Sequence, residues 1–346
     1  MFQKRMIKKT LRPFKSWLVG STNAHLANSF QLLGRMASWQ VRSMSVISSL
    51  QDVEFKVSSQ WGEDGIIDWL VERAQIPPKL QTFIEFGVED YREANTRFLL
   101  QNRNWRGLIM DGSEAMVEAL RADSLAWKHD IIARPAFITR ENINDLISAS
   151  GFRGEVGLLS IDLDGNDYWV WESIDLIQPI ICICEYNAVF GNIHPISIPY
   201  DPVFDRKKAH HSYLYFGASI VALQSLARSK GYRFVGTTSA ANDAFFVRED
   251  YAARFFDQSI NQIQALPSLF RESRDELGQL DYVGGSERFK SISHLPVVNV
   301  ETGIIARLGD LNSVYSSDWL EMMSHGSNED VRQRNRSTTA LEGAKA

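Results

Sequence analysis

The chain has 346 residues, of which 44% are hydrophobic and 11% aromatic, and a formal net charge of −5. This composition excludes a disordered or fibrous chain and predicts a globular protein with a substantial core. No apolar run approaches the roughly 18 to 20 residues that span a bilayer, so a soluble, cytoplasmic protein is expected. The only two cysteines, Cys182 and Cys184, are separated by one residue and are expected to be buried packing thiols.

The first 51 residues are basic, with eight Lys or Arg and no Asp or Glu. Two sets of apolar residues there keep helical spacing: Ile7, Leu11, Phe14 and Leu18, then Leu26, Phe30, Leu33 and Ala37. Residues 1–55 are therefore predicted to be a basic, helical N-terminal extension. Three interpretations stay open: packing on its own domain or in a homodimer, peripheral contact with the inner membrane surface, or an organelle transit peptide. No nucleic-acid partner is expected.

Beyond this extension, predicted helices and strands alternate as in a parallel α/β sheet. The expected helices are 62–76, 95–104, 114–123, 141–151 and 217–231. The expected strands are 82–88, 106–113, 131–139, 155–164 and 179–187, followed by an antiparallel pair at 232–239 and 242–250. The predicted fold class is α/β, a doubly wound, mostly parallel, seven-stranded Rossmann-like sheet with an antiparallel terminal hairpin. This domain is placed at 56–250.

The region after residue 250 carries less functional signal. A helix is expected at 251–266, and a short hairpin at 295–308 is expected to turn at Glu301-Thr302-Gly303. Residues 251–324 are therefore predicted to be a C-terminal extension. The rest of the chain, 325–346, is polar and poor in apolar residues, which predicts a disordered tail.

Polar residues follow the predicted strands at the edge where open α/β sheets bind ligands. The first strand ends with Glu85 and Gly87, and the glycine permits a tight turn beside a ligand. The second ends with Asp111, followed by Gly112 and Ser113, and Asp111 lies 24 residues after Gly87. An acid at about this spacing holds an adenosine ribose in nucleotide-binding folds, although Asp111 could also cap the next helix. Together these features predict a nucleoside site.

Four stretches, SSQWGEDGIIDWL at 58–70, then FIEFGVED, GLIMDGS and LLSIDLDGNDYWV, resemble the FkbM-like S-adenosylmethionine-dependent methyltransferases. The resemblance covers about 56–250 and implies a class I methyltransferase domain with S-adenosylmethionine as its cofactor. It implies cofactor contacts from Gln60, Asp64, Glu85, Gly87, Asp111, Gly112, Ser113 and Asp162. One departure is visible, because the second glycine of the family's first motif is Glu89 here, a charged residue that would narrow the pocket or point outward.

The carboxylates after the fourth strand also resemble those of catechol-type, metal-dependent O-methyltransferases. Those enzymes hold magnesium with an acid after the fourth strand and with an acid and an asparagine after the fifth. The resemblance implies Asp164 (or Asp162), Glu185 and Asn187 as magnesium ligands, which are the hard oxygen donors this ion prefers. Such an ion would activate an acceptor hydroxyl, so Asp164 is also a catalytic candidate. The alternative is that Asp164 and its neighbours only cap the following helix.

The loop from 188 to about 212 is long enough to cover a site. It contains three histidines, His194, His210 and His211. Each could take a hydroxyl proton near neutral pH. His211 is favoured as the general base because of its position close to that helix. Aromatic residues in the same stretch are candidates for stacking on a sugar ring.

Three functions agree with these patterns to different degrees. The favoured one is O-methylation of a hydroxyl on a sugar, glycan or natural product, with a small molecule or glycan as acceptor. A metal-dependent glycosyltransferase would use Asp162-x-Asp164 for a nucleotide sugar, but it would leave the spacing of Gly87 and Asp111 without a role. A non-catalytic adaptor that binds membranes or partners is favoured by Glu89.

Overall fold

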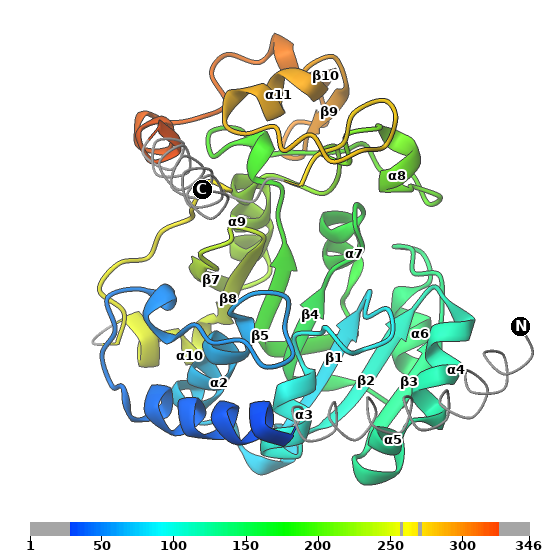
Figure 1. Cartoon of the computed structure of the whole chain (residues 1–346), viewed down its shortest axis with the longest axis vertical. Helices are drawn as coiled ribbons and strands as arrows, with labels where there is room; N and C mark the ends of the chain where they lie inside the picture. Colours follow the sequence, from blue (N-terminus) through cyan, green and yellow to red (C-terminus); the bar gives the residue numbers. More distant parts are fainter. Residues whose placement is uncertain (1–27, 257–258, 269–271, 325–346) are drawn as a thin grey trace, which may run out of the picture.

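The computed structural model describes residues 28–256, 259–268 and 272–324. The predictions for 1–27 and for the tail at 325–346 lie outside these residues. Figure 1 shows a central sheet with helices on both sides and a smaller layer above one edge of the sheet. Within the described ranges, no helix is long and apolar enough to cross a membrane.

The central sheet has seven strands in the order β3-β2-β1-β4-β5-β8-β7. They are β1 (Thr82–Phe86), β2 (Arg106–Asp111), β3 (Ile131–Pro135), β4 (Gly154–Ile161), β5 (Ile177–Glu185), β7 (Tyr232–Thr237) and β8 (Asp243–Arg248). Strands β1 to β5 pair in parallel, whereas β8 runs antiparallel to β5 and β7. The predicted doubly wound sheet with one reversed strand is therefore confirmed. Its strand order reverses between β1 and β4, where such sheets open toward ligands.

Helices cover both faces of this sheet and form two apolar clusters with it. One face carries α2 (Glu63–Ala74), α3 (Arg97–Arg103), α4 (Glu114–Ala122), α5 (Ser124–Lys128) and α10 (Glu249–Phe256). The other carries α6 (Ile143–Ala149), α7 (Asp167–Ser173) and α9 (Ile220–Ser229). In β4, Leu158 joins one cluster and its neighbour Leu159 the other. A strand buried on both faces needs such a continuous apolar run.

The smaller layer, called the cap below, consists of residues 188–219 and 272–316, with 259–268 as a connector. It contains β6 (Ile196–Ser197), α8 (Arg206–Ala209), α11 (Ser286–Ile292), β9 (Pro296–Asn299) and β10 (Ile305–Arg307). Strand β9 pairs antiparallel with β10, as the predicted hairpin requires, and also with β6. Two segments far apart in the sequence thus build one cap over the carboxyl edge of the sheet (Figure 1).

Buried tyrosines fasten the two segments of the cap together. The Tyr215 hydroxyl donates to the carbonyl oxygen of Pro296, and the Tyr315 hydroxyl donates to that of Val189 at 2.9 Å. Cap residues also join the apolar cluster on the α7 and α9 face of the sheet. The cap is therefore packed as a continuation of the same core.

The helix predicted for 251–266 is shorter than expected. Helix α10 ends at Phe256, and residues 259–266 are not helical. The backbone there pairs with the N-terminal extension instead, since Ile47 N–H donates to Ser259 at 2.9 Å and Asn261 N–H donates to Ile47 at 3.1 Å. This pairing places the apolar side chain of Ile260 in the core without a helix.

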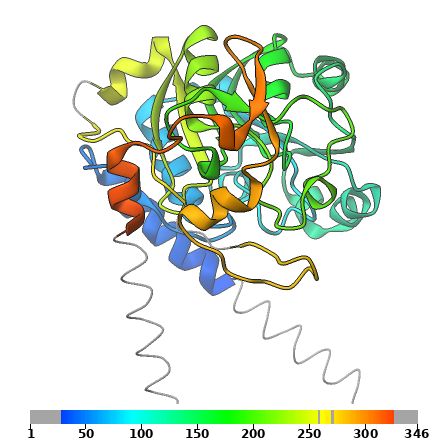
Figure 2. The ribbon, with the colours of Figure 1, turned by 90° about the horizontal axis from the view of Figure 1, so that it is seen from above.

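Residues 28–43 form a helix on the outside of the molecule beside α2 (Figure 2). Its C-terminal end is held by an ion pair of 3.1 Å between Arg42 and Glu72. The opposite side stays apolar and exposed, with Phe30 and Met36 each 58% and Trp39 73% accessible.

Candidate active site

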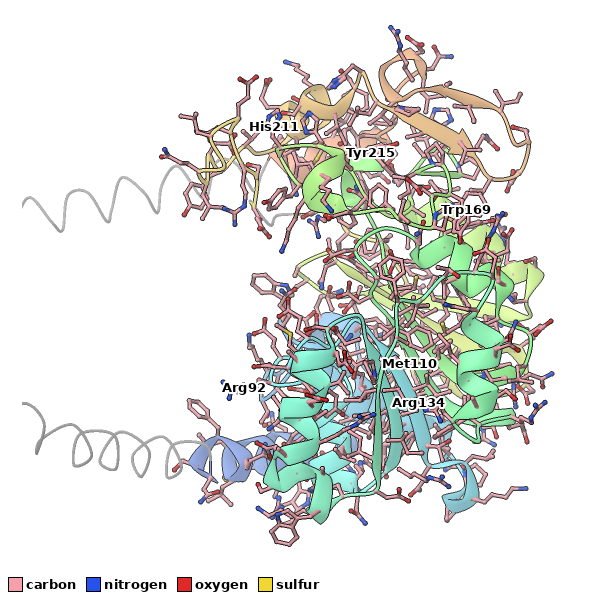
Figure 3. The ribbon with its side chains drawn as sticks, turned by 90° about the vertical axis from the view of Figure 1, so that its right-hand side faces the viewer. Arg92, Met110, Arg134, Trp169, His211 and Tyr215 are labelled. Atoms are coloured by element: carbon pink, nitrogen blue, oxygen red, sulfur yellow. The ribbon has the colours of Figure 1, made fainter. Side chains whose placement is uncertain are left out.

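A cavity of about 700 Å³ lies between the carboxyl edge of the sheet and the cap. Its walls come from the ends of β1, β2, β4 and β5, from the start of β8 and from the cap. In the side view of Figure 3, Met110 of β2 lies in the sheet, below the cap that carries His211 and Tyr215. This is the edge at which the sequence predicts a ligand site.

Glu85 of β1 is a buried carboxyl that organises the loop after its strand. Its oxygens accept hydrogen bonds from the N–H of Asn95 at 2.7 Å, from the N–H of Thr96 at 3.1 Å and from the Thr96 hydroxyl. Burial raises the pKa of Glu85 to about 7, although these hydrogen bonds lower it. The Asn95 amide extends the network by donating to the carboxylate of Asp243 at 3.2 Å. Glu85 thus fixes one wall of the cavity and offers it a titratable acid.

Gly87 lets the ends of β1 and β4 meet at the floor of the cavity. Its φ is +70°, and a Cβ built on it would lie 1.7 Å from the carbonyl oxygen of Asp162. A left-handed backbone and a close approach each favour glycine, and here both apply to the same residue. No other residue type fits this position without moving one of the two strands.

Asp111, the last residue of β2, bridges two loops beside the cavity. One carboxylate oxygen accepts from the N–H of Glu89 and the other from the N–H of Ser113, both at 2.7 Å. Ser113 rather than Asp111 is the N-cap of α4, since its hydroxyl accepts from the N–H of Met116. The capping interpretation of Asp111 is therefore wrong. Its half-buried carboxylate lines the cavity together with Gly112 and Ser113.

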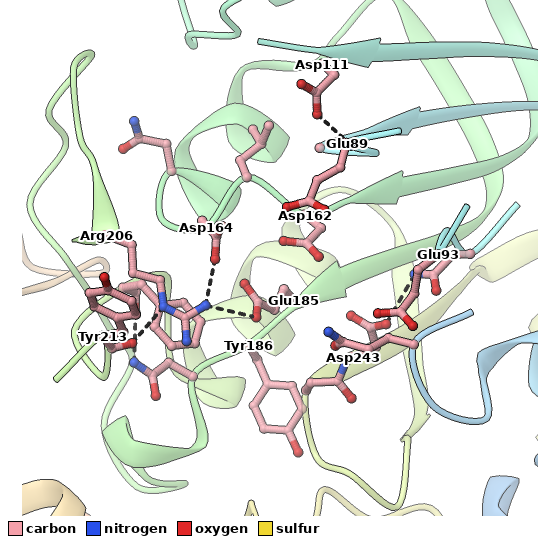
Figure 4. A pocket seen from close by; sticks show the side chains of 18 of the residues that line it. Glu89, Glu93, Asp111, Asp162, Asp164, Glu185, Tyr186, Arg206, Tyr213 and Asp243 are labelled. Carbon is pink, nitrogen blue, oxygen red and sulfur yellow. Dashed lines mark hydrogen bonds and ion pairs between the residues drawn. The ribbon is translucent and has the colours of Figure 1, made fainter. Parts of the chain in front are cut away.

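Glu89 occupies the position where the motif of the methyltransferases that the sequence resembles has its second glycine. Its φ of +47° keeps the left-handed backbone that glycine favours. Figure 4 shows its side chain directed into the cavity, with its carboxylate beside that of Asp162. The replacement therefore narrows the cavity and adds a negative charge to it.

Three carboxylates gather where β4 and β5 end. Oxygens of Asp162, Asp164 and Glu185 lie within 4.8 Å of one another. Asp162 is accessible from the cavity but closely surrounded by protein. Limited hydration, and then repulsion from neighbouring acids, raises the pKa of Asp162 and of Glu185. The group is a strongly acidic part of the cavity wall.

Arg206 of α8 brings a counter-charge from the cap to these acids (Figure 4). Its Nη1 lies 2.6 Å from Asp164 and 4.0 Å from Glu185. Its Nε donates to the carbonyl oxygen of Tyr213 at 2.7 Å, and the guanidinium lies 3.8 Å from the ring centre of Phe216. These contacts hold Arg206 in one orientation between cap and sheet.

Of the predicted magnesium ligands, Asn187 is not free to join the three carboxylates, whose oxygens lie close enough to hold a metal ion. Asn187 is buried, and its amide donates to the carbonyl oxygens of Leu214 and Phe216, both at 2.9 Å. Its side-chain oxygen accepts from the N–H of Val189, so Asn187 is turned into the protein. Asp164, in turn, is paired with Arg206. The arginine therefore supplies a positive charge to the acids that were predicted to hold the ion.

The acids after β4 stabilise their own loop more than the next helix. Asp167 accepts from the N–H of Leu163 at 2.7 Å and of Gly165 at 3.0 Å. Asn166 is the N-cap of α7 but makes no side-chain capping bond, and its amide donates instead to the carbonyl oxygen of Asp201. The prediction that these residues cap the following helix is therefore wrong for Asn166, whose side chain binds the cap, and the side chain of Asp167 binds its own loop instead.

Two of the predicted cofactor contacts, Gln60 and Asp64, lie at different depths. Asp64 is buried in the first turn of α2, where one oxygen accepts from the N–H groups of Val57, Ser58 and Ser59. It does not line the cavity, but it holds the loop that carries Gln60, which does. Asp64 is thus placed to position a wall rather than to touch a ligand.

The predicted general base lies outside the cavity. His211 is exposed, and its ring is 4.2 Å from that of His210. Neither of these residues, nor His194, lines the cavity. The position of His211 before α9 brings it to the outer surface of the cap, so it gives no support for a proton-accepting role.

Several cavity residues were not predicted from the sequence. One of them could have been predicted, and the others could not. Asp243 pairs with Glu185 in the sheet register. An antiparallel strand begins at the edge where its parallel neighbours end, so the predicted hairpin already implied this location. Arg206 and Arg288 come from the cap, and no sequence pattern distinguishes them from neighbouring cations.

Arg206→Met is expected to lower the free energy of unfolding by about 1–3 kcal/mol at pH 8, because partly buried carboxylates lose their partner. The loss of stability should be smaller at pH 5. The pKa values of Asp162 and Glu185 are raised, so these carboxyls take up protons as the pH falls, and a neutral carboxyl needs no cationic partner. Urea unfolding at the two pH values measures both effects. Lys208→Met removes an exposed cation of the same helix and serves as control. Equal losses in the two variants would contradict the proposed role of Arg206.

The sheet order, the reversed strand and the cavity at the carboxyl edge define a doubly wound, Rossmann-like α/β fold. Neither a family model nor a curated protein matches the chain. Among solved structures, it is similar to a S-adenosylmethionine-dependent methyltransferase from Clostridium acetobutylicum at 9% identity and a TM-score of 0.34, over 54% of this chain and 90% of that one.

Two further solved structures show a similar likeness. The N-terminal domain of EvdMO1 with SAH bound has 11% identity and a TM-score of 0.36, over 62% of this chain and 94% of that domain. An O-methyltransferase from Bacillus cereus in complex with SAH has 15% identity and a TM-score of 0.32, over 49% of this chain and 80% of that one.

Proposed function

We propose that this chain is an S-adenosylmethionine-dependent methyltransferase of the FkbM-like group, which methylates a hydroxyl of a sugar, glycan or natural product. One observation supports this most. Glu85, Asp111 and Asp162, at the ends of β1, β2 and β4, line a single cavity beside the turn at Gly87 that only glycine fits. By the motif resemblance these acids serve the methionine end, the ribose and the reacting centre.

The charge of the cavity suits this cofactor. Nine carboxyl residues line it: Glu85, Glu89, Glu93, Asp111, Asp162, Asp164, Glu185, Asp243 and Glu272. S-adenosylmethionine carries a sulfonium, an ammonium and a carboxylate group, so its net charge is positive, and the acids on the sheet side of the cavity attract a ligand of that sign. A volume of about 700 Å³ is within the usual range for small-molecule sites.

The chemistry asked of the protein is limited. The acceptor oxygen forms a bond to the methyl carbon, the carbon–sulfur bond breaks, and the hydroxyl proton must go to a base. Asp162 and Glu185 have raised pKa values and lie at the cavity wall, so they are better placed for this task than His211. Holding both reactants in line supplies the remaining rate enhancement.

Binding of S-adenosylmethionine is expected to release protons between pH 6 and 7. Burial raises the pKa of Glu85 to about 7, so the free protein holds this proton below that pH. A cationic ligand favours the ionised carboxyl, so affinity should fall as the pH decreases, by up to about tenfold per pH unit for each proton released. Calorimetric titrations at pH 6 and 8, in buffers of different ionisation enthalpy, measure affinity and proton release together.

The control ligand is 5′-methylthioadenosine, which keeps the nucleoside but lacks the ammonium and sulfonium groups. We expect it to bind with little proton release. An equal pH dependence for the two ligands would contradict the proposed charge complementarity. Saturable binding of a nucleotide sugar, with none of S-adenosylmethionine, would replace the proposed function by sugar transfer.

A further inference from the structure

The cap side of the cavity is positively charged, in contrast to the acidic sheet side. Arg206, Arg274 and Arg288 all line it. Arg206 is paired with Asp164 at 2.6 Å, and Arg274 has Glu272 at 3.6 Å. Arg288 differs from both, since no acid of the described ranges lies within ion-pair distance of it.

Arg288, in α11, is 8% exposed. Its Nη1 donates to the Ser268 hydroxyl at 3.0 Å, and its buried Nε has no hydrogen-bond partner within the part of the chain that the structure describes. The Nε of Arg274 is in the same state. The guanidinium groups of Arg288 and Arg274 on the cavity wall thus keep N–H donors that can bind a further hydrogen-bond acceptor.

A buried guanidinium without a counter-ion is unfavourable, because the charge loses hydration and gains no partner. Burial lowers the pKa of Arg288 to about 10, which leaves the group charged at neutral pH. Its planar fork matches the two oxygens of a carboxylate or a phosphate. An anionic ligand in the cavity would complete these contacts.

We propose that Arg288, assisted by Arg274, binds an anionic group of the methyl acceptor, a carboxylate or a phosphate. This inference rests on the proposed function, because it assigns the substrate class of the same cavity. The acidic sheet side then takes the cationic cofactor, and the basic cap side takes the anion. An acceptor held at its charged end would present a hydroxyl toward the acids at the ends of β4 and β5.

The test uses the full chain saturated with S-adenosylhomocysteine and three sugars as probes. Calorimetric titration with D-glucuronate, D-glucose 6-phosphate and neutral D-glucose separates the carboxylate, the phosphate and the uncharged ring. At least one anionic sugar should bind about tenfold or more tightly than glucose, because hydrogen bonds to charged partners are the stronger ones. Equal affinities for all three, or no binding of either anion, would overturn the proposal.

Arg288→Gln should remove the preference for the anionic sugar and leave the affinity for S-adenosylhomocysteine unchanged. Lys290→Gln is the matched control, since Lys290 belongs to the same helix, is 66% exposed and does not line the cavity. If Arg288→Gln instead weakens S-adenosylhomocysteine binding, the arginine serves the cofactor and the proposal fails. Absence of S-adenosylhomocysteine binding to the unaltered chain would refute the proposed function itself. The comparison of probes on the unaltered chain requires no variant to fold.

Discussion

Gly87→Ala is expected to abolish S-adenosylhomocysteine binding and to lower the free energy of unfolding by about 2–5 kcal/mol. The new methyl group would lie 1.7 Å from the carbonyl oxygen of Asp162, and the residue would have to keep a φ of +70°. The ends of β1 and β4 can accept it only by separating, which displaces the floor of the cavity. Calorimetry with the ligand and chemical unfolding measure the two effects.

Gly112→Ala is the matched control for this variant. Gly112 lines the same cavity, but an added Cβ there would meet only one atom of Phe137, at 3.9 Å. We expect its stability to change by less than about 1 kcal/mol, as for a compatible glycine replacement. Normal ligand binding by Gly87→Ala would show that the junction of β1 and β4 does not shape the site.

Asp111→Ala is expected to weaken S-adenosylhomocysteine binding by about two orders of magnitude or more. Under the proposed function the ligand would lose the hydrogen bonds between its ribose hydroxyls and this carboxylate, and hydrogen bonds to a charged group contribute about 1.5–3 kcal/mol each. It also accepts from the N–H groups of Glu89 and Ser113, so the loops on both sides would lose a shared anchor. Calorimetric titration gives the affinity, and thermal unfolding shows whether the fold is kept.

Glu114→Ala removes an equal charge three residues away, at an exposed position outside the cavity, and should leave affinity unchanged. Asp111→Asn separates charge from shape, because the side chain keeps its size but turns one acceptor into a donor. We expect its affinity between those of the native chain and Asp111→Ala. If Asp111→Ala binds the ligand normally, the ribose site lies elsewhere.

The sheet could be predicted because short stretches of sequence determine its strands and the helices between them. Runs such as that around Leu158 and Leu159 are apolar on both faces, and amphipathic segments of helical period separate them. The strand ends follow from these elements, so Glu85 and Asp111 could be placed at one edge before any coordinates. The carboxyl ends of parallel strands lie at the same edge of a sheet, whatever the order of the strands in it.

Apart from the hairpin of β9 and β10, the cap could not be predicted, because its contacts join residues far apart in the chain. Arg206 reaches Asp164 from another segment, and Arg288 donates to Ser268 across the connector. His211 was favoured from its position near a helix, but sequence position does not tell which way the loop turns. Asn187 failed for a related reason, since the carbonyl groups that hold its amide belong to the returning cap loop.

The pairing of β6 with β9 has a consequence for how the protein is made. The seven strands of the main sheet are complete at Arg248, whereas the partner of Ile196 in β9 is Asn299. During synthesis the nascent chain can therefore pair all seven strands of the main sheet before the partner of β6, which lies about 50 residues further along the chain, has left the ribosome. A product that stops before Pro296 would contain all seven strands of the main sheet but lack β9 and β10, which with β6 form the small sheet of the cap. Under the proposed function, early termination would leave the acids at the strand ends in place for the cofactor, beneath a cap that has lost its small sheet.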